Sequence, residues 1–172
     1  CGLTSPSGPP HLYMVNDMAE KQPNTRFEES GGGLYKIKGG IGHSDWSADG
    51  MQPHLADKML EYLDENKDSD KPFFLYMALT APHIPLFPSK EFKGKSKIGD
   101  YGDLVMMIDD IVGRVNRKLK EIGKYDNTIV MFAADNGCAG YINMDRINRK
   151  GHYPSYIYRG YKSHGWAGGP RI

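Results

Sequence analysis

A chain of 172 residues is long enough to build one domain with a substantial hydrophobic core. The formal net charge of +1 gives no overall case for a nucleic-acid-binding or membrane-surface protein. The mean hydropathy is −0.57, and no apolar run is long enough to cross a bilayer. The two cysteines, Cys1 and Cys138, are too few for a disulfide framework and do not indicate a compartment.

The N-terminal third of the chain is dominated by loop signals. It opens with CGLTSPSGPP, which contains neither an initiator methionine nor a signal-peptide pattern, and the chain closes with GGPRI. Both ends predict a segment of a longer protein. Within 1–50, residues 12–15 predict a short strand, and His11 is expected at the surface.

Two amphipathic helices are predicted, over residues 52–67 and 101–122. Apolar side chains recur on one face of each at helical spacing. In the first they are Leu55, Met59, Tyr62 and Leu63, and in the second they are Leu104, Ile108, Ile111, Val115, Leu119 and Ile122. Asp100 is the expected N-cap of the second helix, and Gly123 follows its last turn.

Two apolar runs, PFFLYMAL at 72–79 and TIVMFAA at 128–134, predict strands that are buried on both faces. Because these strands alternate with the two helices, the pattern predicts an α/β fold with a mainly parallel sheet. The carboxyl ends of parallel strands lie at one edge of a sheet, where ligands gather. The residues that follow the two runs are therefore expected at the same edge.

Polar residues of functional interest follow both predicted strands. His83 lies between Pro82 and Pro85, which stiffen the segment that presents its imidazole. Asp135 and Asn136 place a carboxylate and an amide oxygen after the second strand. Asp-Asn-Gly is also a good hairpin turn, but the residues after it do not alternate like a returning strand.

Two other clusters contain residue types that occur in functional sites. The adjacent His43, Ser44 and Asp45 contain the residue types of a hydrolytic triad, but neighbours on a loop point in different directions. Residues 146–172 contain no Asp or Glu and interleave six basic residues with tyrosines. This stretch fits a nucleic-acid surface, a basic wall beside an anionic small molecule, or a flexible loop. Its density of glycine and aromatic residues favours a shaped loop.

Three segments together resemble one family, the type I sulfatases (arylsulfatase-like enzymes of the alkaline phosphatase superfamily). They are PFFLYMALTAPHIPL, YGDLVMMIDDIVGRVNRKLKEIGKYDNTIVMFAADNG and RGYKSHGWAGGPRI. The first resembles the family's strand-plus-histidine motif, the second its helix-strand-metal motif and the third its lysine loop (residues 159–172). The resemblance is close over 72–137 and 159–172, weak over 40–67 and negligible before that.

The resemblance implies a partial α/β/α sandwich and the hydrolysis of sulfate esters, on small molecules or sulfated glycans, with a divalent cation. Asp135 and Asn136 resemble two metal ligands, and their oxygens suit Ca²⁺, or alternatively Mg²⁺. His83 resembles the residue that contacts the sulfate ester and protonates the leaving alcohol. Lys162 resembles the lysine that binds a sulfate oxygen and the bridging oxygen. No nucleic acid or membrane partner is implied.

Several family features are missing from the sequence. The family's nucleophile is a formylglycine made within Cys/Ser-x-Pro/Ala-x-Arg, and neither that motif nor the N-terminal aspartate pair nor a Gly-Lys-Trp-His segment occurs here. In the lysine loop, Ala167 replaces the usual Glu and Pro170 a common His.

The expectation is therefore one segment of a single catalytic domain that is inert alone, with a parent that is exported, periplasmic or secreted. It comprises a loop-rich part (1–50), an α/β core (52–137) and a basic active-site loop (138–172). The alternatives are a phosphatase or phosphonate hydrolase of the same superfamily, or a non-catalytic relative that binds sulfated glycans.

Overall fold

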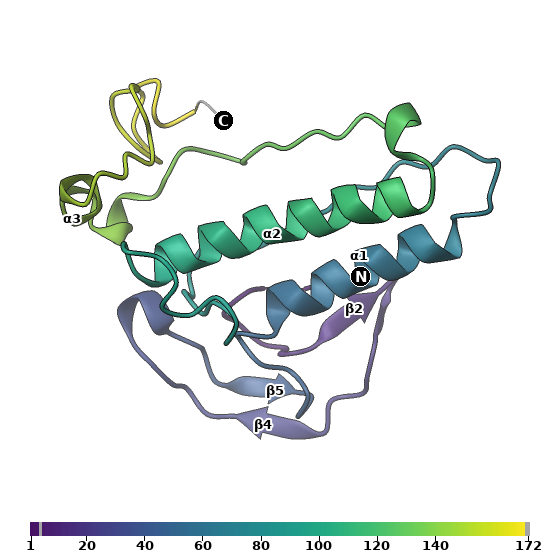
Figure 1. The fold of residues 1–172 in the computed structure, drawn as a ribbon. Coiled ribbons are helices and arrows are strands. Elements are labelled where there is room, and N and C mark those ends of the chain that lie inside the picture. Colours follow the sequence, from purple (N-terminus) through teal and green to yellow (C-terminus); the bar gives the residue numbers. More distant parts are fainter. Residues whose placement is uncertain (4, 171–172) are drawn as a thin grey trace.

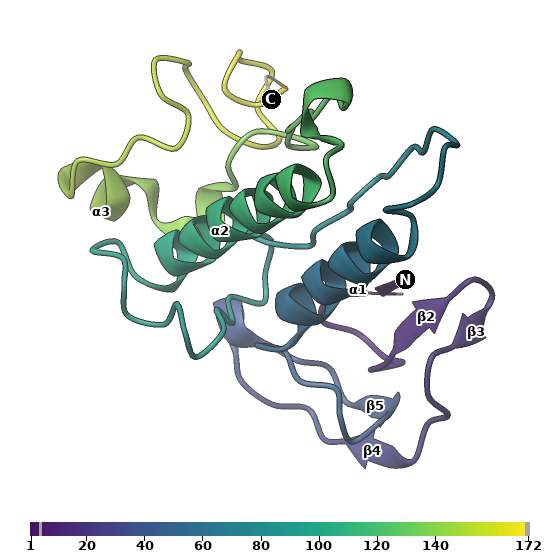
Figure 2. The ribbon, with the colours of Figure 1, turned by 45° about the vertical axis from the view of Figure 1, so that its right-hand side comes forward.

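Two long helices form the centre of the computed structural model, which describes residues 1–3 and 5–170. Helices α1 (Met51–Glu65) and α2 (Asp100–Glu121) lie side by side in both views (Figures 1 and 2). They confirm the helices predicted over 52–67 and 101–122. Their apolar faces pack with the 86–92 segment into the main core, whose buried members are Ala56, Met59, Leu86, Phe92, Leu104, Met107 and Ile111.

A buried carboxylate anchors the loop that precedes α2. Asp103 is fully buried and accepts backbone hydrogen bonds from Gly94 at 2.7 Å and from Ser96 at 2.6 Å. The helix N-cap is Gly99, so the predicted cap, Asp100, is the first helical residue instead. Asp103 therefore stabilises the turn into α2 through its two carboxylate oxygens.

Two small antiparallel sheets lie below α1 in the view of Figure 2. The first has the order β1-β2-β3, with strands Gly2–Leu3, Tyr13–Val15 and Met18–Ala19. The second pairs β4 (Thr25–Phe27) with β5 (Gly40–Gly42). Strand β2 confirms the short strand predicted over 12–15.

His11 is buried, so the expectation of a surface histidine is wrong. It is 1% exposed, its Nε2 lies 2.7 Å from the Lys38 carbonyl oxygen, and its ring contacts Phe27 and Trp46. Long-range pairing near β5 causes this burial, because the His11 backbone forms a bridge to Gly42. The local sequence does not contain that pairing.

The predicted parallel sheet is also wrong for the described part of the chain. Residues 72–79 and 128–134 are extended but belong to neither sheet. Along 73–79 exposure alternates, with Leu75 and Met77 against the core and Phe74 and Tyr76 exposed. Residues 129–134 are exposed on both faces. A β-ladder requires a neighbouring strand, and neither segment has one among the described residues, so the fold observed is mixed α/β.

The remaining elements lie near the two ends of α2. Two 3-10 helices, η2 (Tyr125–Asn127) and η3 (Gly140–Ile142), flank the exposed extended segment, and α3 (Met144–Arg149) follows. A further 3-10 turn, η1 (Gly33–Tyr35), precedes β5. Figure 1 shows α3 near the start of α2, with the chain's last loop above it. No described helix is long and apolar enough to span a membrane.

Candidate functional site

Two backbone hydrogen bonds attach the lysine loop to the residues that follow Asn136. Gly137 donates its N–H to the carbonyl oxygen of Gly169 at 2.7 Å, and Lys162 donates its N–H to Cys138 at 2.8 Å. These bonds join residues that are 32 and 24 positions apart in the sequence. They hold the backbone of Lys162 against Cys138, two residues after Asn136.

The lysine loop is shaped by contacts among its own residues. The Arg159 guanidinium lies 4.0 Å from the centre of the Trp166 ring, and the rings of Tyr161 and His164 are 3.9 Å apart. Gly168 donates its backbone N–H to Arg159 at 2.8 Å, which closes the loop. Lys162 is half-buried within it. The sequence prediction of a shaped loop agrees with these contacts.

Gly137 is required by this close packing. A Cβ atom at Gly137 would overlap the carbonyl group of Gly168, so any other residue would push the lysine loop away. The Asp-Asn-Gly sequence thus ends in glycine because two backbones meet there, and not because a hairpin turns there.

His83 is exposed and presents one free ring nitrogen. Its Nδ1 lies 2.6 Å from the carbonyl oxygen of Ile84. Because a carbonyl only accepts hydrogen bonds, Nδ1 carries a proton, and Nε2 is left for a ligand. The ring lies edge-on to Tyr141, with ring centroids 6.4 Å apart.

Tyr141 links the histidine to the Asp135 segment, and the sequence analysis missed it. Tyr141 is 41% exposed, and partial desolvation is the main cause that raises its pKa, with the charges of Cys138 and Asp135 raising it further. A backbone hydrogen bond from Ile84 opposes this shift. Tyr141 therefore interacts both with Asp135 and with Ile84, the residue that follows His83. Tyr141 belongs to no periodic pattern, so only its place six residues after Asp135 hinted at a role.

Cys138 is a half-buried thiol beside this site. Its Sγ lies 3.4 Å from the Tyr101 hydroxyl. Burial raises the pKa of Cys138 above its ordinary value, and it outweighs hydrogen bonds from Tyr101 and Ala139 that lower it. Since the thiolate is the reactive form, Cys138 is a poor nucleophile near neutral pH. This agrees with its lack of the formylglycine motif.

The donor atoms of Asp135 and Asn136 fit a hard cation in type but supply only part of a site. Asp135 is exposed and Asn136 is half-buried. Ca²⁺ takes six to eight oxygen ligands, whereas this pair provides a carboxylate and an amide. Over residues 1–3 and 5–170, Asp135 belongs to no group of three His, Cys, Asp or Glu donors within 4.8 Å.

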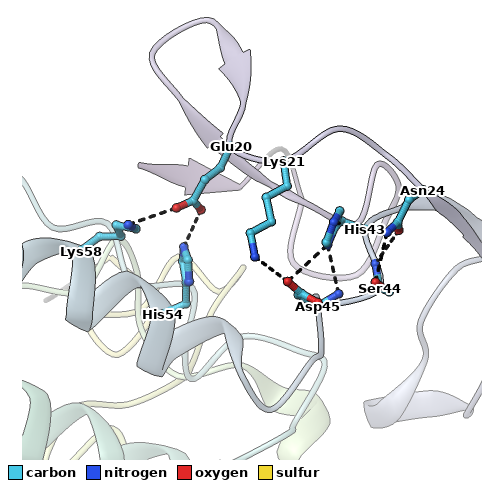
Figure 3. Close-up of polar contacts among 8 residues, drawn as sticks. All are labelled: Glu20, Lys21, Asn24, His43, Ser44, Asp45, His54 and Lys58. Carbon is cyan, nitrogen blue, oxygen red and sulfur yellow. Dashed lines mark hydrogen bonds and ion pairs between the residues drawn. The ribbon is translucent and has the colours of Figure 1, made fainter.

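His43, Ser44 and Asp45 do not form a hydrolytic triad (Figure 3). The Ser44 hydroxyl accepts a hydrogen bond from Asn24 at 3.2 Å, and Asp45 forms an ion pair with Lys21 at 2.5 Å. The His43 Nδ1 is 3.1 Å from the backbone N–H of Asp45. These contacts stabilise a loop, and the absence of a triad agrees with the sequence analysis.

A comparison with known protein families shows which family the chain belongs to. Residues 11–169 match the family described as Sulfatase. The chain belongs to the sulfatase family. The family resemblance inferred from three segments of this sulfatase is thereby confirmed, and the match extends to residue 11, into the part where the sequence analysis found the resemblance negligible.

Relatives of this sulfatase chain share between a quarter and a half of its residues over the aligned parts. It is similar to an N-acetylgalactosamine-6-O-sulfatase of Bacteroides thetaiotaomicron, with 33% identity over 130 residues, 74% of this chain and 25% of the relative. It is similar to the N-acetylgalactosamine-6-sulfatase of Rattus norvegicus, with 44% identity over 46% of this chain and 15% of the relative.

A solved structure gives the same assignment. It was described for the metabolism of multiple glycosaminoglycans by Bacteroides thetaiotaomicron, and it matches with a TM-score of 0.67 and 29% identity. The match covers 78% of this chain and 29% of that one. The chain therefore spans about a quarter of the length of these two Bacteroides relatives.

Proposed function

We propose that residues 1–172 are part of one sulfatase catalytic domain that hydrolyses sulfate esters. The attachment of the lysine loop to residues 137 and 138 carries this proposal. It supports a single site in which Lys162 and the Asp135–Asn136 pair act on the same sulfate group. The contact between Tyr141 and His83 supports adding the histidine to that site.

His83 and Lys162 are the proposed catalytic and substrate-binding residues. The Lys162 ammonium binds a sulfate oxygen and the bridging oxygen, where negative charge develops as the ester bond breaks. The free Nε2 of His83, when protonated, donates to the leaving alcohol oxygen. General-acid assistance of this kind contributes about 10²–10⁴-fold in rate.

Asp135 and Asn136 are the proposed metal ligands, for Ca²⁺ or Mg²⁺. A bound divalent cation would stabilise negative charge on the sulfate and on the nucleophile. The Asp135 carboxylate and the Asn136 amide oxygen would hold the ion, and the hydrogen bond of Gly137 to Gly169 keeps the backbone next to Asn136 against the lysine loop. The other ligands and the formylglycine nucleophile are expected from residues outside 1–172.

The proposed substrate class is a 6-sulfated N-acetylgalactosamine unit of a glycosaminoglycan. The relatives from a bacterium and from a mammal support it, because both are named for that sulfated sugar. An anionic polymer also suits the acid-free stretch at 146–170, where Arg159 and Lys162 lie on one loop.

The first experiment measures turnover of an aryl sulfate by the 172-residue chain with added Ca²⁺. No turnover is expected, since the chain lacks a Cys/Ser-x-Pro/Ala-x-Arg motif. Sulfate release by the chain itself would contradict the proposed missing nucleophile. An aryl phosphate is assayed in parallel, and its hydrolysis would instead assign the chain to phosphate ester chemistry.

The second experiment measures binding of a 6-sulfated N-acetylgalactosamine oligosaccharide by calorimetry. Lys162→Ala and His83→Ala should each weaken binding, while Lys120→Ala should not. Lys120 is the matched control because it carries the same charge at the far end of α2, where it lies over Tyr125. Equal weakening by Lys120→Ala would mean that only net charge attracts the glycan, against the proposed site.

A further inference from the structure

Three side chains of different ligand type converge beside the first turn of α1. They are Cys1, Glu20 and His54, whose sulfur, oxygen and nitrogen atoms all lie within 4.8 Å of one another. Among the described residues no other three His, Cys, Asp or Glu donors come so close. Cys1 precedes β1, Glu20 follows β3, and His54 lies in the first turn of α1.

The distances are close to those of a tetrahedral zinc site. The Cys1 Sγ is 3.8 Å from the His54 Nε2, and the Glu20 Oε2 is 2.8 Å from the same nitrogen. Around tetrahedral Zn²⁺ the separations are about 3.6 Å for sulfur and nitrogen and about 3.4 Å for oxygen and nitrogen. The Glu20 and His54 side chains would therefore have to separate by about 0.6 Å to hold one ion, and the Cys1–His54 distance needs to change by only about 0.2 Å.

Neighbouring residues hold two of the donors in place. Lys58 lies 3.1 Å from the Glu20 Oε1, so the other carboxylate oxygen, Oε2, faces His54 (Figure 3). Tyr13 stacks on the His54 ring with centroids 3.6 Å apart and an angle of 16° between the planes. Such supporting contacts are what orient ligands in protein metal sites.

A cavity of about 250 Å³ beside the cluster leaves room for a fourth ligand. Glu20 and His54 both line it. A thiolate, an imidazole and one carboxylate oxygen are ligands of Zn²⁺, whereas Ca²⁺ selects oxygen atoms only. The donor set therefore differs in kind from that of Asp135 and Asn136.

We propose that Cys1, Glu20 and His54 bind Zn²⁺, with water from the adjacent cavity as the fourth ligand. The ion connects the start of the chain and the β2–β3 hairpin to α1. It stabilises the fold, and it takes no part in the sulfatase site proposed above. The zinc proposal does not depend on the proposed function.

The experiment titrates the metal-free 172-residue chain with Co²⁺, which reports its ligands by absorption. Equimolar binding with a thiolate-to-cobalt charge-transfer band is expected, and Zn²⁺ should displace the cobalt. Cys1→Ser should abolish the band. Glu20→Gln and His54→Gln should each weaken binding by roughly tenfold or more.

Matched controls separate this site from other metal-binding groups. Cys138→Ser removes the other thiol, Glu61→Gln removes the second acidic partner of Lys58, and Asp135→Ala removes the proposed calcium ligand, so none should change the titration. Circular dichroism of each metal-free variant confirms folding. If Glu20→Gln and His54→Gln bind cobalt as tightly as the unaltered chain, the thiol binds alone and the proposal is wrong. Loss of the band in Cys138→Ser overturns it as well.

Discussion

Lys162 is fixed to Cys138 by its backbone N–H, which donates to the Cys138 carbonyl oxygen at 2.8 Å. The backbone of Lys162 is therefore positioned by a main-chain contact, independent of any substrate. Together with the bond between Gly137 and Gly169, this contact sets the distance between the lysine loop and the Asp135 segment.

Gly137→Ala should displace the lysine loop, because the new Cβ would overlap the carbonyl group of Gly168. The expected loss is about 1–3 kcal/mol in the free energy of unfolding. Hydrogen exchange at the Lys162 N–H should accelerate, as that N–H loses its partner at Cys138. Gly165→Ala is the control, since a Cβ there meets nothing within 4 Å. Equal effects of the two substitutions would contradict the close backbone approach.

Asp103→Ala should lower the free energy of unfolding by about 2–4 kcal/mol, because two backbone N–H groups lose charged acceptors in a buried setting. Urea denaturation measures the change. Asp109→Ala is the matched control on the same helix, where the carboxylate is exposed, and it should change stability by less than about 0.5 kcal/mol. A small effect at Asp103 would mean that the 94–96 turn holds its shape without that side chain.

Iodoacetamide should modify Cys1 before Cys138 when a chelator keeps the chain metal-free. Cys1 is exposed, whereas Cys138 is half-buried and burial raises the pKa of its thiol. Mass spectrometry of timed samples near the ordinary thiol pKa of about 8.5 measures both rates. Faster labelling of Cys138 would show that its thiol is neither protected nor raised in pKa.

The raised pKa of Cys138 also predicts a pH dependence of stability. Folding favours the protonated thiol, so its contribution is complete below the ordinary thiol pKa and is lost as pH rises through the value in the folded state. Because tyrosines titrate in the same range, the measurement is the difference between the unaltered chain and Cys138→Ser. That difference in the free energy of unfolding should fall with rising pH. A rise would mean that folding lowers the pKa of Cys138, against the direction given above.

The extended segment at 129–134 should promote self-association. Ile129 is 87% exposed and Met131 is 82% exposed, which leaves apolar side chains and unpaired backbone groups at the surface. Replacing both residues with Lys should lower the apparent mass in concentrated solution and reduce binding of an apolar dye. Met106→Lys controls for the added charge, because Met106 is also exposed but lies on α2, outside the 129–134 segment. If the double variant binds as much dye as the unaltered chain, the apolar surface that the dye contacts lies outside residues 129–134, and the prediction is wrong.

Local patterns were sufficient for the helices and for the family, but not for the sheet. Helices α1 and α2 follow from apolar spacing, because each helix satisfies its own backbone hydrogen bonds within a few residues. The runs at 72–79 and 128–134 carry equally clear strand composition. They remain unpaired in the described residues, because a strand is completed by another strand and not by its own sequence.

The sequence by itself determined the two long helices, the strand β2 and the residue types of a sulfatase site at His83, Asp135, Asn136 and Lys162. The roles of those four residues stay predictions. Tertiary structure alone decided that the lysine loop meets residues 137 and 138, that Tyr141 lies beside His83, and that Cys1, Glu20 and His54 converge. Helical periodicity is encoded within a few turns of chain, whereas these contacts join residues far apart in the sequence and exist only once the chain has packed.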